Sequence, residues 1–163
     1  MYLLPGVVKS WAPIGEPPVL HHGNIYTHLS LISAVSPEGD FVFQLQETSY
    51  TSADVIAFLE HLHATTGGKL LVVWDSAPIH RSLEIKEFLT AGAAAWLRLE
   101  ALPGYAPDLN PDEGIWNHLK YVELKNQCFQ TLAPLREAAE TALAKIKATP
   151  EIVKGCFRQA RLC

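Results

Sequence analysis

An acidic side chain at the end of an apolar run is the first feature of the sequence that could do chemistry. The segment Leu70–Trp74 is continuously apolar, which is typical of a strand buried on both faces, as in a parallel sheet covered by helices. Asp75 follows it directly, and the turn residues Ser76, Ala77 and Pro78 come next. A carboxylate in this position projects into the crevice where open α/β sheets place their sites. Asp75 is therefore a candidate site residue, although a residue that only caps the turn would also suit this position.

A second candidate lies at the start of a helix further along the chain. Asn110 is a good N-cap and Pro111 a good first helical residue, so the sequence predicts a helix that begins there, with Asp112 and Glu113 in its first turn. Acidic residues are common in first turns because they complement the helix dipole, and this alternative applies to both. We interpret Asp108 and Asp112 as turn and cap residues. The two predicted stripes of this helix are Ile115, Leu119 and Val122, which are apolar, and Glu113, Asn117 and Lys120, which are polar.

The segments around Asp75 and Glu113 read Trp-Asp-Ser-Ala-Pro-Ile-His-Arg-Ser and Leu-Pro-Gly-Tyr-Ala-Pro-Asp-Leu-Asn-Pro-Asp-Glu-Gly-Ile-Trp-Asn-His-Leu-Lys. They resemble the second and third catalytic blocks of the DDE transposases, in particular bacterial insertion-sequence members of the mariner-like superfamily. The short interval between the two acidic residues is close to the spacing of that group. A further segment, Trp-Ala-Pro-Ile-Gly-Glu-Pro-Pro-Val from Trp11, is similar to the stretch after the family's first block. The resemblance thus covers nearly the whole chain.

The resemblance implies metal-assisted phosphoryl transfer on DNA. In the complete family site, two divalent ions, Mg²⁺ or Mn²⁺, clamp the attacking and leaving oxygens of an in-line displacement at a phosphate. Hard cations need oxygen ligands, so carboxylates are the expected residue type. Asp75 and Glu113 would be catalytic, metal-binding residues and would supply two of the three carboxylates. His80 matches a histidine common in the second block, and His80 and Lys120 are the expected DNA-contacting residues.

The fold class that the resemblance implies is α/β, a ribonuclease H-like mixed sheet flanked by helices. In that family the first catalytic aspartate lies on the first strand, and Met1 comes after the point where it should be. We therefore expect a single catalytic domain over residues 1–163 that lacks its first strand and the helix-turn-helix region that recognises DNA. Such a chain should not catalyse efficient strand transfer by itself, and the neighbours of the missing strand should keep an unpaired edge.

Hydrophobic patterning predicts the elements that must position these residues. Residues 1–19 should be mostly irregular, with Trp11 as a packing anchor. Thr27 to Val35 should form a strand with Leu29, Leu31 and Ser33 on one face. The remaining predictions are a turn over 37–40, a returning strand over 41–46, a helix capped by Thr51 or Ser52 and buried through Val55, Phe58, Leu59 and Leu62, a helix over 82–90 buried through Leu83, Ile85 and Phe88, a strand over 95–102, and two helices after residues 131 and 149.

Composition limits the class of protein. With 163 residues and 48% hydrophobic content the chain can bury the core of one domain. It has no apolar run long enough to span a membrane and no recognisable export signal. Cys128, Cys156 and Cys163 lack a metal-ligand spacing, so we expect reduced thiols and a cytoplasmic location. A formal net charge of −4 argues against a free-standing nucleic-acid binder, so local basic residues and metal ions would have to offset it.

Three functions stay open at this point. In the first, the chain is a transposase catalytic domain that acts on transposon ends and target DNA and has a second copy of itself as a further candidate partner. In the second, it is an inactive remnant that binds DNA or a transposase subunit. In the third, it is a decayed reading frame that folds without a role at DNA. A group of basic residues near the C-terminus is interpreted as a solvated face rather than a DNA track. Its members are Lys145, Lys147, Lys154, Arg158 and Arg161.

Overall fold

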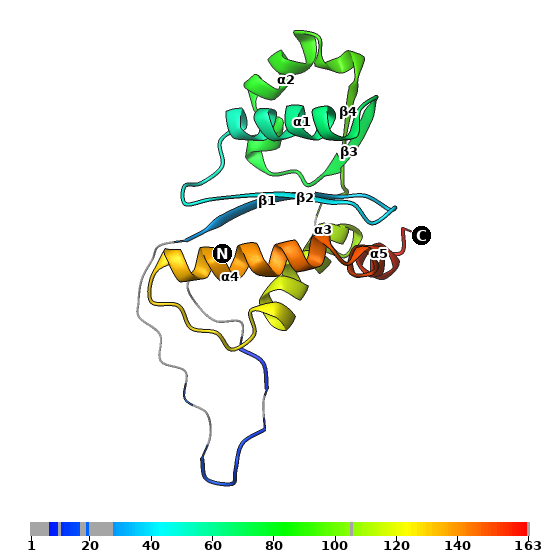
Figure 1. Ribbon diagram of the computed structural model, residues 1–163. Coiled ribbons are helices and arrows are strands. Elements are labelled where there is room, and N and C mark those ends of the chain that lie inside the picture. The colour runs from blue at the N-terminus through cyan, green and yellow to red at the C-terminus, as the bar shows by residue number, and fades with distance from the viewer. Residues whose placement is uncertain (1–6, 10, 17–18, 20–27, 105, 163) are drawn as a thin grey trace.

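The computed structural model describes residues 7–9, 11–16, 19, 28–104 and 106–162. Two strands come first, helical elements surround the next two strands, and only helical elements follow the fourth strand (Figure 1). In chain order they are β1 (Ser30–Val35), β2 (Phe41–Gln46), α1 (Ser52–Thr66), β3 (Leu70–Trp74), η1 (Pro78–Arg81), α2 (Leu83–Thr90), η2 (Ala93–Ala95), β4 (Leu97–Ala101), η3 (Pro107–Leu109), α3 (Pro111–His118), η4 (Leu119–Glu123), α4 (Leu132–Lys147) and α5 (Pro150–Gln159).

An antiparallel hairpin of β1 and β2 forms the middle layer of the molecule (Figure 1). Its register pairs Ser30 with Gln46 and Val35 with Phe41, as the predicted turn over 37–40 requires. Gly39 in that turn has a φ of 101°, a conformation that suits glycine because it has no Cβ. The predicted hairpin is confirmed, and β1 begins within the predicted range of 27–35.

The two faces of the hairpin line two separate cores. Leu29, Leu31 and Val35 pack with α3, η4, α4 and α5 beneath the hairpin in Figure 1, in what we call the lower core. Ile32 and Ala34, which alternate with them, pack with α1, α2, β3 and β4 above the hairpin, in the upper core. Alternation along a strand sends successive side chains to opposite faces, so one hairpin can serve as the shared wall of both cores.

β3 and β4 run parallel and form a second two-stranded sheet. Leu70, Val72 and Trp74 pack in the upper core, but Leu71 and Val73 are 63% and 54% exposed. The prediction that β3 is buried on both faces is therefore wrong, because α1 and α2 cover one face and no described element covers the other. Among the described residues β3 and the hairpin belong to separate sheets, and β3 pairs with β4 alone.

Capping residues set the start of α1 and α2. Thr51 accepts a hydrogen bond from the amide of Asp54, and the Asp54 carboxylate accepts one from the amide of Thr51, which makes a complete capping box. The Ser82 hydroxyl accepts from the amide of Ile85 and caps α2 in the same way. The four residues predicted for the buried face of α1 are all buried. In α2, Ile85 is buried as predicted, whereas Leu83 is 66% exposed and its predicted burial is wrong, because it lies at the first position of a short helix.

The helix after the proline-rich loop changes its geometry in the middle. α3 begins at Pro111 with Asn110 as its N-cap, as predicted, and continues as a π-helical turn over Leu119–Glu123. The amide of Leu124 donates to the carbonyl of Leu119, five positions back. Ile115 and Leu119 are buried, but Val122 is 50% exposed. The prediction that Val122 shares one face with Ile115 and Leu119 is wrong, because a π turn carries more residues than an α turn and rotates the later positions.

The ends of the chain differ in how they pack. α4 and α5 are confirmed and supply Leu143, Ile146 and Val153 to the lower core. Trp11 is fully exposed, so its predicted role as a packing anchor is wrong. Cys128 and Cys156 are free thiols, as predicted, and Cys163 lies outside the described residues. None of the described helices combines the length and the apolar character needed to cross a bilayer.

Candidate functional site

Asp75 lies directly after β3, where the sequence places it, and its side chain is 59% exposed. Its Oδ1 accepts a hydrogen bond from the amide of Ala77 at 2.9 Å, which closes the turn after the strand. The same Oδ1 lies 2.9 Å from Nδ1 of His80. Both contacts use one oxygen, so the geometry orients the carboxylate and leaves Oδ2 outside these contacts. The turn-capping alternative is thus correct as far as Oδ1 is concerned.

His80 is held more tightly than Asp75. It lies in η1, its side chain is 17% exposed, and its ring stacks on Trp74 with a centroid distance of 4.3 Å and an interplanar angle of 3°. Nδ1 also lies 3.2 Å from the backbone carbonyl oxygen of Asp75. Because both neighbours of Nδ1 are oxygen acceptors, Nδ1 is the atom that donates to them. His80, which is itself held by its stack on Trp74 at the end of β3, therefore fixes the orientation of the Asp75 carboxylate.

Glu113 lies in the first turn of α3, whose start is fixed by Asn110. The Asn110 Oδ1 accepts from the amide of Asp112 at 3.1 Å, and its carbonyl oxygen accepts from the amide of Glu113 at 3.2 Å. Glu113 lines a cavity of about 450 Å³ between the end of the proline-rich loop, α3 and the C-terminal part of α5. Asn117, Gln159 and Arg161 also line this cavity and give it polar walls. An ion or a polar ligand beside Glu113 would find amide groups, the acidic residue Asp108 and one guanidinium there.

Asp112, the neighbour of Glu113, does more than cap the helix. Both of its carboxylate oxygens lie within hydrogen-bond distance of the hydroxyl of Ser33 on β1, at 2.9 and 2.8 Å. Burial raises the pKa of Asp112 to about 6, more than the Ser33 hydrogen bond lowers it, and the nearby charge of Glu113 adds to the rise. The interpretation of Asp112 as a cap residue missed this contact. The only sequence signal was Ser33, a polar residue on the apolar face of the predicted strand.

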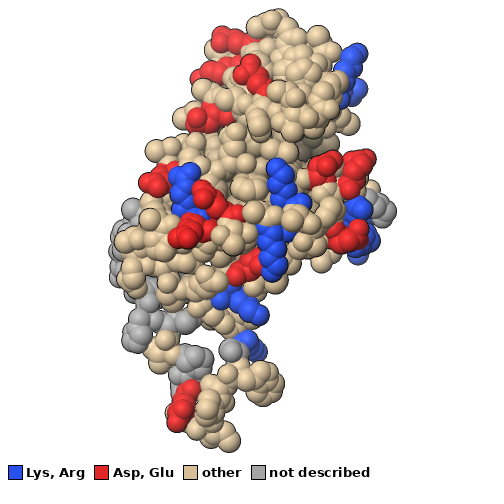
Figure 2. Space-filling model, viewed as in Figure 1, with Lys and Arg blue, Asp and Glu red and all other residues tan. Residues whose placement is uncertain are grey.

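Charged side chains give no continuous basic stripe on the face that Figure 2 shows. Over the lower layer, Lys and Arg side chains are interspersed with acidic ones. Two members of the C-terminal basic group have acidic partners, since Lys145 contacts Glu123 at 2.8 Å and Lys154 contacts Glu151 at 3.1 Å. These pairings agree with the interpretation of that group as a solvated face.

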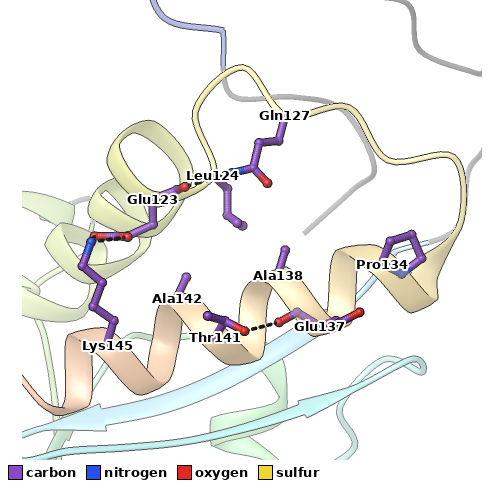
Figure 3. Close-up of a pocket in the computed structure, with 9 residues that line it drawn as sticks. All are labelled: Glu123, Leu124, Gln127, Pro134, Glu137, Ala138, Thr141, Ala142 and Lys145. Carbon is purple, nitrogen blue, oxygen red and sulfur yellow. Dashed lines mark hydrogen bonds and ion pairs between the residues drawn. The ribbon is translucent and has the colours of Figure 1, made fainter.

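A second hollow, of about 390 Å³, lies between η4 with its following loop and α4 (Figure 3). Ala138 and Ala142 point from α4 toward Leu124, and Glu137, Thr141 and Gln127 lie around them. The hollow shares no lining residue with the cavity beside Glu113. Its apolar floor therefore belongs to the packing of η4 on α4 and not to the candidate site.

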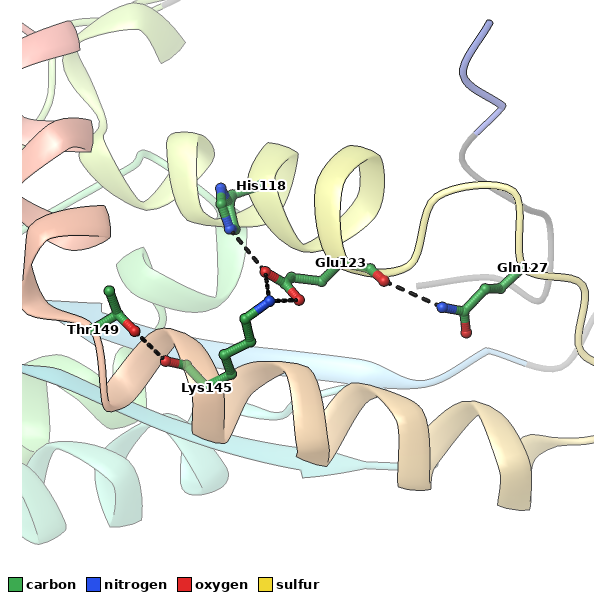
Figure 4. Close-up of polar contacts among 5 residues, drawn as sticks. All are labelled: His118, Glu123, Gln127, Lys145 and Thr149. Atoms are coloured by element: carbon green, nitrogen blue, oxygen red, sulfur yellow. Dashed lines mark hydrogen bonds and ion pairs between the residues drawn. The ribbon is translucent and has the colours of Figure 1, made fainter. Parts of the chain in front are cut away.

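The π-helical turn is tied to α4 by a charged group at one end of this hollow (Figure 4). Glu123, whose side chain is 11% exposed, accepts from Nζ of Lys145 with both oxygens and lies 3.2 Å from Nε2 of His118. These contacts, with the Lys145 hydrogen bond as the largest cause, lower the pKa of Glu123. Lys120 lies on the same turn and is exposed, so its predicted DNA contact is sterically open.

Asp75 and Glu113 therefore occupy two differently built corners of the fold. No hydrogen bond or ion pair between them occurs in the described part of the chain. Within the same residues, no group of three or more His, Cys, Asp or Glu side chains is arranged to hold a metal ion. To share two metal ions, the two carboxylates would have to approach within about 8 Å of each other, and this approach remains a prediction.

Both the sequence and the fold of the chain are similar to known proteins. The sequence profile described as DDE superfamily endonuclease matches residues 6–136. Among solved structures, the fold is similar to the Mos1 strand transfer complex, with a TM-score of 0.58 and 19% identity over 96% of this chain and 50% of that chain. It is also similar to the Mos1 mariner paired end complex with Mn, with a TM-score of 0.60 and 18% identity over 98% of this chain and 53% of that chain.

The isolated catalytic domain of Mos1 mariner transposase gives a TM-score of 0.50 and 19% identity over 80% of this chain and 72% of that chain. The chain spans about half the length of the Mos1 chains in the complexes. A search of curated protein sequences found no significant match. At these identities the likeness concerns the fold, and it confirms the predicted ribonuclease H-like α/β class. Because the family profile covers most of the sequence, including Asp75 and Glu113, the chain belongs to the DDE superfamily endonuclease family.

Proposed function

We propose that the chain is the catalytic domain of a DNA transposase of the insertion-sequence type, which cleaves DNA strands and transfers them during transposition. The observation that carries this proposal is the family match, which includes both candidate carboxylates. The Mos1 neighbours support it, because one is described as a strand transfer complex and another as a paired-end complex with the left transposon end. We expect the partners to be transposon-end and target DNA, with a second copy of the chain as a further partner.

Asp75 and Glu113 are the proposed metal ligands. Their oxygen donors suit Mg²⁺ or Mn²⁺, and one Mos1 complex is described with Mn. The fit is partial, because the described residues supply two carboxylates at these positions while the complete family site, with two ions, uses three. Bound ions would stabilise the charge that develops on the attacking and leaving oxygens of the phosphate.

The residues of this chain would orient the ligands. His80 and the amide of Ala77 fix Oδ1 of Asp75, so the other oxygen is presented in a constant direction. The Asn110 cap fixes the backbone of Glu113 beside the cavity that Glu113 lines. His80 is thereby assigned first to the orientation of Asp75, and its predicted contact with DNA is secondary.

An inactive remnant that binds DNA or another transposase subunit is the second candidate. It is favoured by the lack of a three-carboxylate cluster among the described residues. Nicking of supercoiled plasmid with Mg²⁺ or Mn²⁺ separates the two. The chain and a form extended upstream by an aspartate-bearing strand should be compared.

Under the transposase proposal the extended form nicks the plasmid, and Asp75→Ala or Glu113→Ala each lowers the rate by at least about a hundredfold. The chain alone should nick far more slowly. No nicking by the extended form, with its DNA binding intact, would favour the remnant. Nicking by the chain alone that vanishes in Asp75→Ala would show that another of its residues completes the site.

The predicted DNA contact of Lys120 has its own test. If Lys120 meets a phosphate, Lys120→Ala should weaken binding to any DNA sequence about equally and reduce the slope of log affinity against log salt by about one unit. Lys86, an exposed lysine of α2, provides the matched control through Lys86→Ala. An unchanged salt slope would return Lys120 to a solvated helix position.

A further inference from the structure

The first turn of α3 is tied to the hairpin by a single hydroxyl group. The Ser33 Oγ on β1 lies 2.9 and 2.8 Å from the two carboxylate oxygens of Asp112, and the Nε1 of Trp116 donates to the same Oγ at 3.1 Å. Asp112 and Trp116 are four positions apart and so lie on one face of the helix. Ser33 therefore joins two successive turns of α3 to β1.

The hydrogen-bonding capacity of Ser33 fits these partners. A serine hydroxyl has one hydrogen to donate and two lone pairs to accept with. It donates to the Asp112 carboxylate and accepts from the Trp116 indole. Because the three groups are partly buried, a displaced helix would leave polar atoms unpaired, which costs more than the hydrogen bonds contribute.

The other side of α3 is in close contact with α5, which lies beside it in Figure 1. A Cβ atom added at Gly114 would lie 2.8 Å from Sγ and 3.0 Å from Cβ of Cys156, closer than real contacts allow. The glycine thus lets the two helices approach, and no space is left for α3 to shift toward α5. The start of α3 is confined between β1 and α5.

Glu113 lies between these two contacts in the sequence. We infer that Ser33 and Asp112 form a clamp that fixes the first turn of α3 on β1 and thereby positions the carboxylate of Glu113, so that Asp112 is a positioning residue. The inference rests on the proposed function only for the role of Glu113. Among the described residues, the Asp112 carboxylate contacts the Ser33 hydroxyl and makes no ion pair. A buried carboxylate in such surroundings is not the arrangement that stability alone would favour, which accords with a role in fixing geometry.

Amide hydrogen exchange tests the clamp without using activity. The amide of Glu113 donates to the carbonyl of Asn110, so its exchange rate reports whether the first turn stays closed. Ser33→Ala and Asp112→Ala should each raise that rate by about tenfold. The amide of Phe58 in α1 should be unaffected. Asp112→Asn, which keeps an acceptor for Ser33, should restore a rate close to that of the wild type.

The double variant Ser33→Ala/Asp112→Ala should exchange at Glu113 no faster than Ser33→Ala alone, because Ser33→Ala already removes the contact with Asp112. A matched control is the exposed pair of Ser36 Oγ and Asp40 Oδ2, 2.9 Å apart in the hairpin turn. Ser36→Ala should leave the Glu113 amide unchanged. If Asp112→Ala does not fold, Ser33→Ala, which removes one atom, carries the test.

The clamp would be overturned if the exchange rate of the Glu113 amide were unchanged in Ser33→Ala. It would also be overturned if the effects of the two substitutions on that rate were additive. The outcome is separate from that of the proposed function. Faster exchange together with a wild type that never nicks DNA would reject the function and keep the clamp. In an active extended form, Asp112→Ala should lower the nicking rate at saturating DNA while leaving DNA affinity unchanged, and an effect on affinity alone would contradict positioning of Glu113.

Discussion

The described polar contacts of Asp75 come from Ala77 and His80, within five positions of it, and the side chain remains 59% exposed. For Glu113, the only nearby residue in the sequence with a described contact that helps to place it is Asn110, the N-cap of its helix. Its helix is placed by Ser33, which lies 79 positions from Asp112, and by close packing on Cys156. We call Asp75 with Ala77 and His80 the Asp75 corner, and Glu113 with the contacts that place its helix the Glu113 corner. The Asp75 corner is built by a single turn of the chain, whereas the Glu113 corner is assembled from β1, α3 and α5, which are distant in sequence.

This difference has a consequence for how each corner responds to change. Substitutions far away in sequence should alter the Glu113 corner and leave the Asp75 corner intact, whereas the Asp75 corner should respond mainly to its own turn.

Removing the charge of Asp112 should have the largest effect. Its pKa is raised from 3.8 to about 6 by burial, so the folded state disfavours the ionised form. The stability that the neutral form of Asp112 contributes is fully present below 3.8, the pKa of this group in the unfolded chain. It is lost as the pH rises through about 6, the pKa in the folded state. The wild type should therefore lose up to about 3 kcal/mol relative to Asp112→Asn between about pH 4 and pH 8. Urea unfolding of both proteins in metal-free buffer measures this, and a difference that does not vary with pH would contradict it.

Filling the contact between α3 and α5 should come next. Gly114→Val places atoms where Cys156 already lies, and overpacking of this kind costs about 1–3 kcal/mol. Gly104→Val is the matched control, because a Cβ there meets nothing within 4 Å. Denaturant unfolding should show a loss in the first variant and a change within about 0.5 kcal/mol in the second. Equal effects would mean that α3 is not confined on its α5 side.

Loss of the His80 ring should have the smallest and most local effect. His80→Asn removes the stack on Trp74 and the contact with Asp75, which together contribute about 1 kcal/mol. Near-ultraviolet circular dichroism should report a changed environment of Trp74. Amide exchange at Glu113 should stay at the wild-type rate. A faster rate at Glu113 would show that the two corners are coupled and would break the comparison.

The parts of the fold that follow from local sequence were predictable. The capping box of Thr51 and Asp54, the Asn110 cap and the hairpin turn each depend on residues a few positions apart. The position of Asp75 after an apolar strand is of the same kind.

The remaining features depend on which elements meet. Exposure of Leu71 and Val73 reflects a sheet face that no described helix covers, and no pattern within the strand encodes it. Exposure of Val122 reflects a π turn, which a stripe drawn at α-helical spacing misses. The contact of Ser33 with Asp112 joins residues that only the packed fold brings together.

Binding of Mn²⁺ tests most directly whether Asp75 and Glu113, for all their difference in surroundings, serve one site. Electron paramagnetic resonance of free Mn²⁺ gives the affinity of the chain and of Asp75→Asn, Glu113→Gln and the double variant, with Glu60→Gln as an exposed acidic control in α1. For a shared site, each single substitution should lower the affinity for Mn²⁺ by at least about tenfold. The affinity of the double variant should be no lower than that of the single variant that binds Mn²⁺ more weakly. Affinity that stays unchanged in either single variant, or losses that add in the double variant, would contradict a shared metal site.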